Sequence, residues 1–408
     1  LYTYWVLIRD FDGSVLMLSD QDVGYRGEIP ERTPEECSEL LAFEGALCAV
    51  QNSYLKASNT GGGDEFGGSL ALDGNLMVIA APREDSSASG VGGQQFDENA
   101  QESGAVYVLS RASEQSPWEH EAYLKPIDNM HGDGEDALFG SSVAISGNTV
   151  AVGAPGANNG KGAVHVFVRS GGIWMPQQLL VADDPEAWQG SRNNGSDGLD
   201  ETAPKFGFSV AIDGNTILAG APHRDAIPES ALPDYPYPEN YPWRNFRLPR
   251  TGAAYVFTRS GNRWSQQRVL IGANTNQTPR YYSEAPDQGS IGFRTARFRE
   301  MNALWGCEHE WWDDRGSWGE PRNVLFGYSV ALSGDLAVVG SPGDKKPVTG
   351  VFPGDYMGCP HWGISNALGS VSVFHRGDGS WGQTAYLKSP VMNLDGRFGH
   401  SVAVDGQT

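Results

Sequence analysis

The sequence predicts an all-β protein, a β-propeller of four-stranded antiparallel blades, of which about five are visible in this chain. Three observations lead to this prediction. A phrase that begins with Phe-Gly and ends with Ala-Pro or Ser-Pro recurs along the 408 residues. A second pair of predicted strands follows each complete copy of it. The composition, with 53 glycines and 24 prolines, is typical of many short strands joined by turns.

The recurring phrase sets the length of the repeat. It occupies residues 66–82, 139–155, 206–222 and 326–342, and it begins once more at Phe398. Successive phenylalanines are 73, 67, 120 and 72 residues apart. One unit therefore has roughly 70 residues, and the third carries roughly 50 more, which is the period of a repeat array.

Each phrase predicts a β-hairpin. In the second copy, Ser142-Val-Ala-Ile145 alternates small or polar residues with apolar ones, as in a strand with two unlike faces. Ser146-Gly147-Asn148 supplies the positive φ that a tight reversal requires. The segment 149–155 then returns as a buried strand that its terminal proline ends.

The second half of each unit predicts two further strands. The third strand follows a glycine and ends at an arginine, and a tryptophan opens the fourth strand after a short polar turn. These residues are Gly104, Gly162, Gly252 and Gly369; Arg111, Arg169, Arg259 and Arg376; and Trp118, Trp174, Trp264 and Trp381. Four strands leave two bare faces, and packing neighbours around an axis buries both, so we expect the phenylalanines and tryptophans to wedge between blades.

These FG…GAP units resemble FG-GAP repeats, the blades of the integrin α-subunit head and of related extracellular propellers. The resemblance covers residues 54–408 and, weakly, residues 1–9. It implies a ring that usually has seven blades and a role in cell adhesion. Repeats of this family often carry a calcium loop inside the hairpin. Here the loop is reduced to Asp-Gly-Asn or Ser-Gly-Asn, which cannot supply the six or more oxygens that calcium requires, so these sites are not carried over.

The two ends of the chain contain incomplete units. Residues 1–53 predict a partial first blade with a small helical, cysteine-containing insertion, and 54–408 predict the remaining blades. Trp5–Arg9 resembles a third strand, and Tyr54-Leu55-Lys56 resembles the fourth-strand segments at 123–125 and 386–388. Either the two partial units combine into one blade that closes a ring, or the chain is a fragment of a longer propeller.

Charge and cysteine content indicate an extracellular or cell-surface protein. Lys and Arg number 29 against 50 Asp and Glu, a net charge of −21, which disfavours nucleic acid and anionic lipid as partners. No apolar run approaches the roughly 18 residues of a membrane helix. The four cysteines fit two disulfides, and two sequons at Asn194 and Asn276 are candidate glycosylation sites.

The cysteine pairs have different contexts. Cys37 and Cys48 are expected to close the small helical loop. Cys307 and Cys359, which lie in two different insertions, predict a disulfide between them; the alternative is a zinc or copper site with His309 and His361.

The long insertions predict a binding face. In an antiparallel blade, the strand 2–3 and 4–1 connections share one side, and the insertions 223–251, 271–325 and 343–368 all belong to these connections. Their aromatic residues could stack on sugars or anchor a protein, or they could instead form small local cores. The candidate ligand-binding residues are Tyr241, Trp243, Trp305, Trp311, Trp312 and Trp362.

Two acidic stretches precede Phe-Gly pairs and could hold calcium as the one expected cofactor. Because their spacing departs from D-x-D-x-D-G, solvated Asp-Gly turns are the alternative. The carboxylates are Asp128, Asp133, Glu135 and Asp136 in one stretch, and Asp197 and Asp200 in the other.

The sequence favours a non-catalytic function. Gly-x-Ser-x-Ala recurs in every blade, which marks it as a strand and not as a nucleophile elbow. His309-Glu310-Trp-Trp-Asp313 lacks the second histidine of H-E-x-x-H. We therefore expect a secreted or cell-surface binding or structural module that engages an extracellular protein or a glycan. The alternatives are a carbohydrate-binding lectin, a polysaccharide-acting enzyme, or self-assembly into a surface structure.

Overall fold

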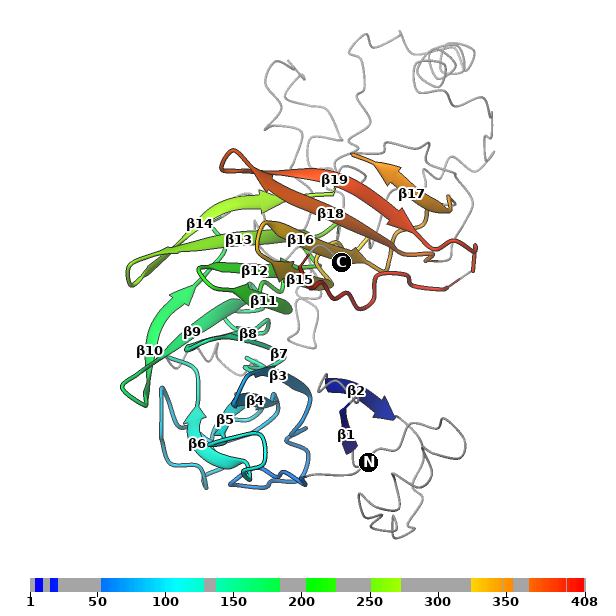
Figure 1. Ribbon diagram of the computed structural model, residues 1–408. Coiled ribbons are helices and arrows are strands. Elements are labelled where there is room, and N and C mark those ends of the chain that lie inside the picture. Colours follow the sequence, from blue (N-terminus) through cyan, green and yellow to red (C-terminus); the bar gives the residue numbers. More distant parts are fainter. Residues whose placement is uncertain are drawn as a thin grey trace, which may run out of the picture.

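The computed structural model is an all-β protein whose sheets follow one another in chain order along an arc (Figure 1). No helix occurs among the residues that it describes. Those residues are 4–9, 15–20, 53–127, 137–183, 203–224, 251–272, 324–346, 348–354, 367–393 and 395–406. β1 (Tyr4–Arg9) and β2 (Val15–Asp20) form a separate antiparallel hairpin.

Four larger sheets contain the predicted repeats, and we call them blades 1 to 4. Blade 1 consists of β3 (Ser69–Asp73), β4 (Leu76–Ala81), β5 (Ala105–Ser110) and β6 (Glu119–Leu124). Blade 2 consists of β7 (Ser142–Ser146), β8 (Thr149–Ala154), β9 (Ala163–Ser170) and β10 (Ile173–Leu180). Both are antiparallel, with strands in chain order across the sheet.

Blades 3 and 4 repeat this order. Blade 3 consists of β11 (Ser209–Asp213), β12 (Thr216–Ala221), β13 (Ala253–Ser260) and β14 (Arg263–Leu270). Blade 4 consists of β15 (Ser329–Ser333), β16 (Leu336–Ser341), β18 (Ser370–Gly377) and β19 (Ser380–Lys388). Its fifth strand, β17 (Gly350–Pro353), pairs with the outer edge of β19. Four-stranded sheets in chain order confirm the predicted propeller blades.

The first strands of neighbouring blades lie side by side, and hydrogen bonds join them. The turn glycine of one blade donates its N–H to the side chain that ends the first strand of the preceding blade. Thus Gly147 N donates to Asp73 Oδ2 at 2.5 Å, and Gly334 N donates to Asp213 Oδ2 at 2.6 Å. Serine takes the place of aspartate at Ser146, which accepts from Gly214, and at Ser333, which accepts from Gly406. The predicted two-residue turns thereby hold the blades together.

The phenylalanines and tryptophans lie between blades, as predicted. Phe139 and Trp174 of blade 2 pack in one core cluster with Val106 and Leu124 of blade 1. Phe206 and Trp264 pack in the next cluster against blade 2, and Phe326 and Trp381 pack against blade 3. Strand residues alternate between the clusters on their two sides, so both faces of a blade become buried.

Glycine is required where one blade meets the next. A Cβ on Gly153 would overlap the carbonyl oxygen of Gly207, and a Cβ on Gly220 would overlap that of Gly327. These two pairs combine the glycine of one Gly-Ala-Pro with the glycine of the following Phe-Gly. These glycines therefore recur in the phrase because the backbones of neighbouring blades pack closely there.

The arginine that ends each third strand fastens the short turns. Arg259 Nε donates to Asn215 Oδ1 at 2.8 Å, and its guanidinium lies 5.1 Å from the Trp264 ring centroid. Arg376 makes the same contacts with Asp335 and Trp381. The Arg, the turn residue and the Trp thus form a structural group on the side of the strand 1–2 and 3–4 turns.

Two predicted strands are absent from the described residues: one at Tyr54-Leu55-Lys56, and the first strand of the hairpin expected after Phe398, since residues 401–405 form no strand. The similarity of Tyr54-Leu55-Lys56 to fourth strands predicts a strand here, yet no strand occurs in residues 53–60, and the Tyr54 side chain is exposed. The segment instead runs beside blade 1, where the Lys56 carbonyl oxygen lies 3.0 Å from His120 Nε2. Without a paired neighbour in a sheet, the Tyr-Leu-Lys pattern alone does not form a strand.

Candidate functional site

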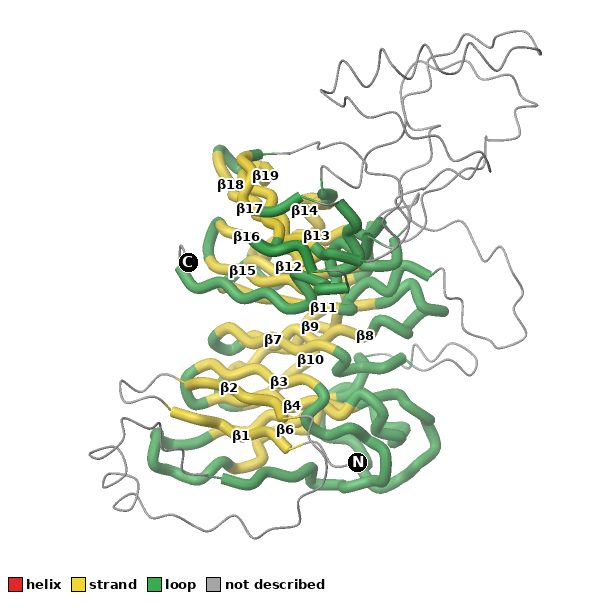
Figure 2. The backbone as a smooth tube through the Cα atoms, turned by 90° about the vertical axis from the view of Figure 1, so that its right-hand side faces the viewer, coloured by secondary structure: helices red, strands yellow, loops and turns green. Residues whose placement is uncertain are grey.

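The antiparallel order sorts the connections between strands by side, as the sequence predicts. The strand 1–2 and 3–4 turns lie at one end of each blade, and the strand 2–3 and 4–1 connections lie at the other end (Figure 2). We call this second end the long-connection face. In blades 1 and 4, described residues on this face form a buried cluster of a carboxylate, a tyrosine and a lysine.

The blade 1 cluster is centred on Glu84, two residues after Pro82. Its Oε1 accepts hydrogen bonds from Tyr123 Oη at 2.8 Å and from Asn59 Nδ2 at 2.7 Å. Its Oε2 accepts from Lys125 Nζ at 2.7 Å and from Ser86 Oγ at 3.2 Å. Glu84 is 2% exposed and Lys125 is fully buried, so the pair is shielded from water.

The charged and hydroxyl side chains of the blade 1 cluster all have hydrogen-bond partners. Lys125 Nζ also lies 2.6 Å from Ser103 Oγ, and Tyr107 Oη donates to Asn59 Oδ1 at 2.6 Å. Burial lowers the pKa of Lys125, and the charge of Glu84 opposes that shift. Burial also raises the pKa of the Tyr123 phenol above its ordinary value. The cluster therefore fastens residues 59, 84–86 and 103 to the end of β6.

The blade 4 cluster places Asp344 where blade 1 has Glu84. Asp344 is 3% exposed; its Oδ2 accepts from Tyr386 Oη at 2.5 Å, and its Oδ1 accepts from the backbone N–H of Lys346 at 2.9 Å. Lys388 corresponds to Lys125, but its Nζ lies 3.8 Å from Asp344 Oδ1, too far for a hydrogen bond.

Lys346 changes the charge of the blade 4 cluster. It occupies the position of Ser86, so within the described part of the cluster one carboxylate faces two ammonium groups. The Nζ atoms of Lys346 and Lys388 are both buried, and neither has a hydrogen-bond partner. Burial lowers the pKa of Lys346, Asp344 opposes that shift, and Lys388 adds to it. Burial would raise the pKa of Asp344, but Lys388 and the hydrogen bonds it accepts hold that pKa below its usual value.

Blades 2 and 3 lack this cluster. The position of Glu84 is occupied by Ala157 in blade 2 and by Arg224 in blade 3. The position of Lys125 is occupied by Val181 and Ile271. The cluster is therefore a property of two blades and is not part of the repeat.

The two blades with clusters also share a strand 2–3 connection that folds back along the outer strand. In blade 1, Val91 forms an isolated bridge with Leu124, and Gly92 N donates to Tyr123 O at 2.9 Å. In blade 4, β17 pairs with β19 from Gly350 opposite Lys388 to Pro353 opposite Ala385. The returning connection covers the tyrosine and lysine of the outer strand, which explains why they are buried.

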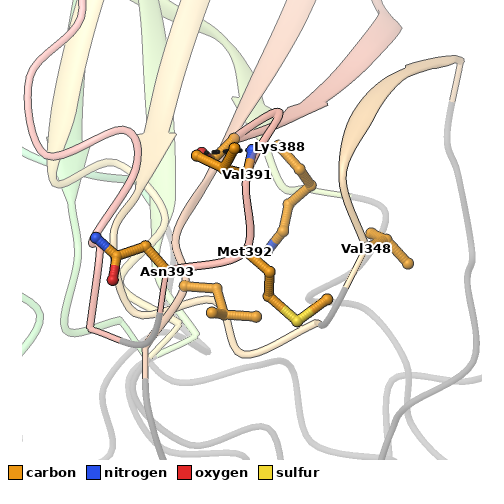
Figure 3. Close-up of a pocket in the computed structure, with 7 residues that line it drawn as sticks. Val348, Lys388, Val391, Met392 and Asn393 are labelled. Carbon is orange, nitrogen blue, oxygen red and sulfur yellow. Dashed lines mark hydrogen bonds between the residues drawn. The ribbon is translucent and has the colours of Figure 1, made fainter.

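Two hollows adjoin these features. A hollow of about 10 Å³ is lined by Lys388 and mostly apolar neighbours, with Val348 across from Lys388 and Met392 (Figure 3). A wider groove of about 460 Å³ runs between β6 and the β9–β10 turn. In this groove Glu121 is already paired, because its Oε1 accepts from Trp174 Nε1 at 2.7 Å and lies 2.6 Å from Arg169 Nε.

The predicted site residues lie outside the residues that the structure describes, so their placement remains a prediction. These are Tyr241, Trp243, Trp305, Trp311, Trp312 and Trp362; Asp128, Asp133, Glu135, Asp136, Asp197 and Asp200; Cys37, Cys48, Cys307 and Cys359; and Asn194 and Asn276. Within the described ranges, no group of three or more His, Cys, Asp and Glu side chains could hold a metal ion. No helix in the same ranges is long and apolar enough to span a membrane.

The sequence contains a signal for the two clusters. Tyr-Leu-Lys occurs at 123–125 and again at 386–388, and a Pro ends the hairpin of each of these two blades. An acidic residue two positions after that Pro occurs in the same two blades, at Glu84 and Asp344. A buried lysine requires a nearby anion, so this coincidence predicts the pairing.

The comparisons with known proteins agree with the repeat but do not indicate an activity. No curated protein matches the chain. Two solved structures, both of proposed 6-phosphogluconolactonases, are similar to it. The protein from Bacteroides uniformis is 12% identical, with a TM-score of 0.28, and the match covers 79% of this chain and 72% of that one. The protein from Bacteroides fragilis is 11% identical, with a TM-score of 0.30, and the match covers 85% and 75%. Likenesses this weak say nothing about activity.

The family comparison concerns the repeat itself. The model of the FG-GAP repeat matches residues 50–109, 118–167 and 322–352. These segments contain the first hairpin and third strand of blade 1, most of the corresponding part of blade 2, and the hairpin of blade 4. The chain therefore contains FG-GAP repeats, which form the blades of a β-propeller.

Proposed function

We propose that the protein is a secreted or cell-surface binding module without catalytic activity, which engages a protein or glycan partner through its long-connection face. The observation that carries this proposal is the sorting of connections by the antiparallel blades. All of the long insertions join strand ends on that face. Loops borne on a rigid scaffold are the usual place for recognition.

The blade 1 cluster supports the view that the long-connection face is a rigid scaffold for binding. Glu84, Lys125 and Tyr123 tie the 83–104 connection to the outer strand through short hydrogen bonds. A connection held in this way is pre-organised, so that less conformational entropy is lost when a partner binds. The same saturation supports a non-catalytic role, because the Glu84 carboxylate already accepts four hydrogen bonds and has no free position at which to take up a proton.

A pair of photo-crosslinking variants tests which face is used. Asn159 lies in the strand 2–3 turn of blade 2 on the long-connection face, whereas Asn262 lies in the strand 3–4 turn of blade 3 at the opposite end. Both are exposed asparagines, so each can carry a photoreactive residue without loss of core packing. On a cell-surface preparation, we expect adducts at least several-fold more abundant from position 159. Equal yields, or more adducts from position 262, would contradict the proposal.

A glycan array distinguishes a glycan partner from a protein partner. Selective binding that is lost in Trp311→Ala or Trp243→Ala would identify the module as a lectin, because the flat ring of tryptophan can stack on a sugar ring. Ile173→Ala, at an exposed position in the β9–β10 hairpin at the opposite end, is the control. Failure to bind any glycan, together with crosslinks to protein at position 159, would identify a protein partner.

A further inference from the structure

We propose that blade 4 binds a single small anion, of the size of chloride, beside the ammonium group of Lys388, in a cluster to which Lys346 adds a second buried ammonium. The site lies on the long-connection face, in a blade whose cluster otherwise resembles that of blade 1. Its occupant is a structural ion, independent of the partner proposed above.

The first argument is the balance of charge. Asp344 carries one negative charge, and the two lysines carry two positive charges. Burial of an ion that no opposite charge compensates is strongly unfavourable, because the ion loses its hydration, so a buried excess charge is normally compensated. In blade 1 the corresponding cluster has one carboxylate and one ammonium, at 2.7 Å from each other.

The second argument is the hydrogen bonding of the lysines. An ammonium group has three N–H donors, and a buried donor without an acceptor is unfavourable because it has lost its hydrogen bonds to water. Lys388 Nζ has no hydrogen-bond partner although its side chain is only 1% exposed. Lys346 Nζ is buried and also lacks a partner. Asp344 does not satisfy Lys388, since its Oδ1 lies 3.8 Å from Lys388 Nζ, beyond hydrogen-bond distance.

The third argument is the space beside Lys388. The hollow of about 10 Å³ in Figure 3 is close to the room that one water molecule needs. Its other walls are Val348, Leu368, Val391 and Met392, together with Ser389 and Asn393. A chloride ion is only slightly larger than water, whereas phosphate and sulfate are too large. Apolar walls also strengthen the attraction between the ion and Lys388, because they exclude water.

A matched set of variants tests the proposal on the full chain. Lys346→Ser reproduces the serine of blade 1 and leaves one lysine with one carboxylate, so we expect no anion site. Lys345→Ser changes the preceding lysine and serves as the control. The first readout is the broadening of the ³⁵Cl NMR signal by the protein, which we expect to fall at least twofold in Lys346→Ser and to be unchanged in Lys345→Ser.

The melting temperature is the second readout. Sodium chloride should raise the Tm of the wild type above its value in sodium gluconate at the same ionic strength, by about 2 °C when chloride is tenfold above its Kd. Lys346→Ser should show no difference between the two salts. Equal chloride effects in the wild type and Lys346→Ser, or no chloride-specific broadening in the wild type, would overturn the proposal. In that event the second ammonium is compensated by another part of the chain or is neutral.

Discussion

Blades 1 and 4 bury the same kind of side-chain cluster, but the charges in the two clusters differ. In both, a connection folds back over the outer strand and buries a tyrosine and a lysine against an acidic residue. Blade 1 completes the group with Ser86, and every strong donor and acceptor is paired. Blade 4 has Lys346 at that position, and two ammonium groups remain without hydrogen bonds.

The difference teaches that one side chain can turn a structural cluster into a candidate ion site. The fold at this position is the same, because both clusters join the end of strand 2 to the end of strand 4. The two clusters differ at one position, where blade 1 has the hydroxyl group of Ser86 and blade 4 has the ammonium group of Lys346. Blade 2 shows a third solution, in which Ala157 and Val181 replace both charged groups.

The largest expected effect comes from removing the carboxylate of blade 1. Glu84→Ala leaves Lys125 buried without its counter-charge, and we expect a loss of about 3–5 kcal/mol in the free energy of unfolding. Urea denaturation followed by tryptophan fluorescence measures it. The double variant Glu84→Ala, Lys125→Val installs the residues of blade 2 and should recover much of the loss. Glu119→Ala, at an exposed position on β6, is the control; no recovery in the double variant would contradict a charge-based explanation.

Installing the blade 4 pattern in blade 1 tests the comparison from the other direction. Ser86→Lys adds a second ammonium to a cluster with one carboxylate and little space, so we expect a loss of about 2–4 kcal/mol. The same denaturation experiment measures it, and Ser87→Lys at the neighbouring exposed position should have little effect. A Ser86→Lys protein as stable as the wild type would show that blade 1 tolerates the extra charge, and the contrast between the blades would lose its meaning.

A buried histidine in blade 2 makes the stability depend on pH. His165 stands where blades 1 and 3 have Tyr107 and Tyr255. Burial lowers its pKa from 6.5 to about 3. As the pH falls below 6.5 the unfolded chain binds a proton before the folded chain does, so stability is lost between pH 6.5 and 3. From pH 6.5 to 5 we expect a loss of about 2 kcal/mol.

His165→Tyr, which installs the residue of blades 1 and 3, should abolish this loss between pH 6.5 and 5. Denaturation at several pH values provides the measurement, and His375→Tyr, at an exposed position on β18, is the control that should keep the dependence. The same slope in the wild type and in His165→Tyr would place the titrating group elsewhere.

The smallest expected effect is a gain in blade 4. In chloride-free buffer, Lys346→Ser removes an ammonium group that Lys388 repels, and we expect stability to rise by about 1 kcal/mol. Thermal denaturation detects the change, with Lys345→Ser as the control. A clear loss of stability would mean that Lys346 makes a favourable contact that the carboxylate of Asp344 cannot account for.

Much of the fold could be predicted because the same residue types recur wherever the same packing constraint recurs in each repeat. Phe139, Phe206 and Phe326 are recurrent because each fills the space between two blades, and Gly153 and Gly220 because a side chain would collide with the next blade. Patterns at fixed spacing therefore predicted strands, turns and the sorting of connections. Tyr54-Leu55-Lys56 shows the limit, because a pattern without a neighbouring strand to pair with does not form one.

The clusters could not be predicted in the same way. Glu84 and Lys125 are 41 residues apart, and Asp344 and Lys388 are 44 residues apart, so only the sheet brings them together. Their burial depends on how the strand 2–3 connection folds back, which no local pattern specifies.

The sequence by itself determined the repeat, the two-residue turns and the side on which the long connections lie, since these follow from local periodicity and from antiparallel order. Only the tertiary structure decided which charged side chains lose contact with water and which find partners. Desolvation depends on every surrounding segment at once, and the surroundings of Lys125 and Lys388 differ although their local sequences are the same.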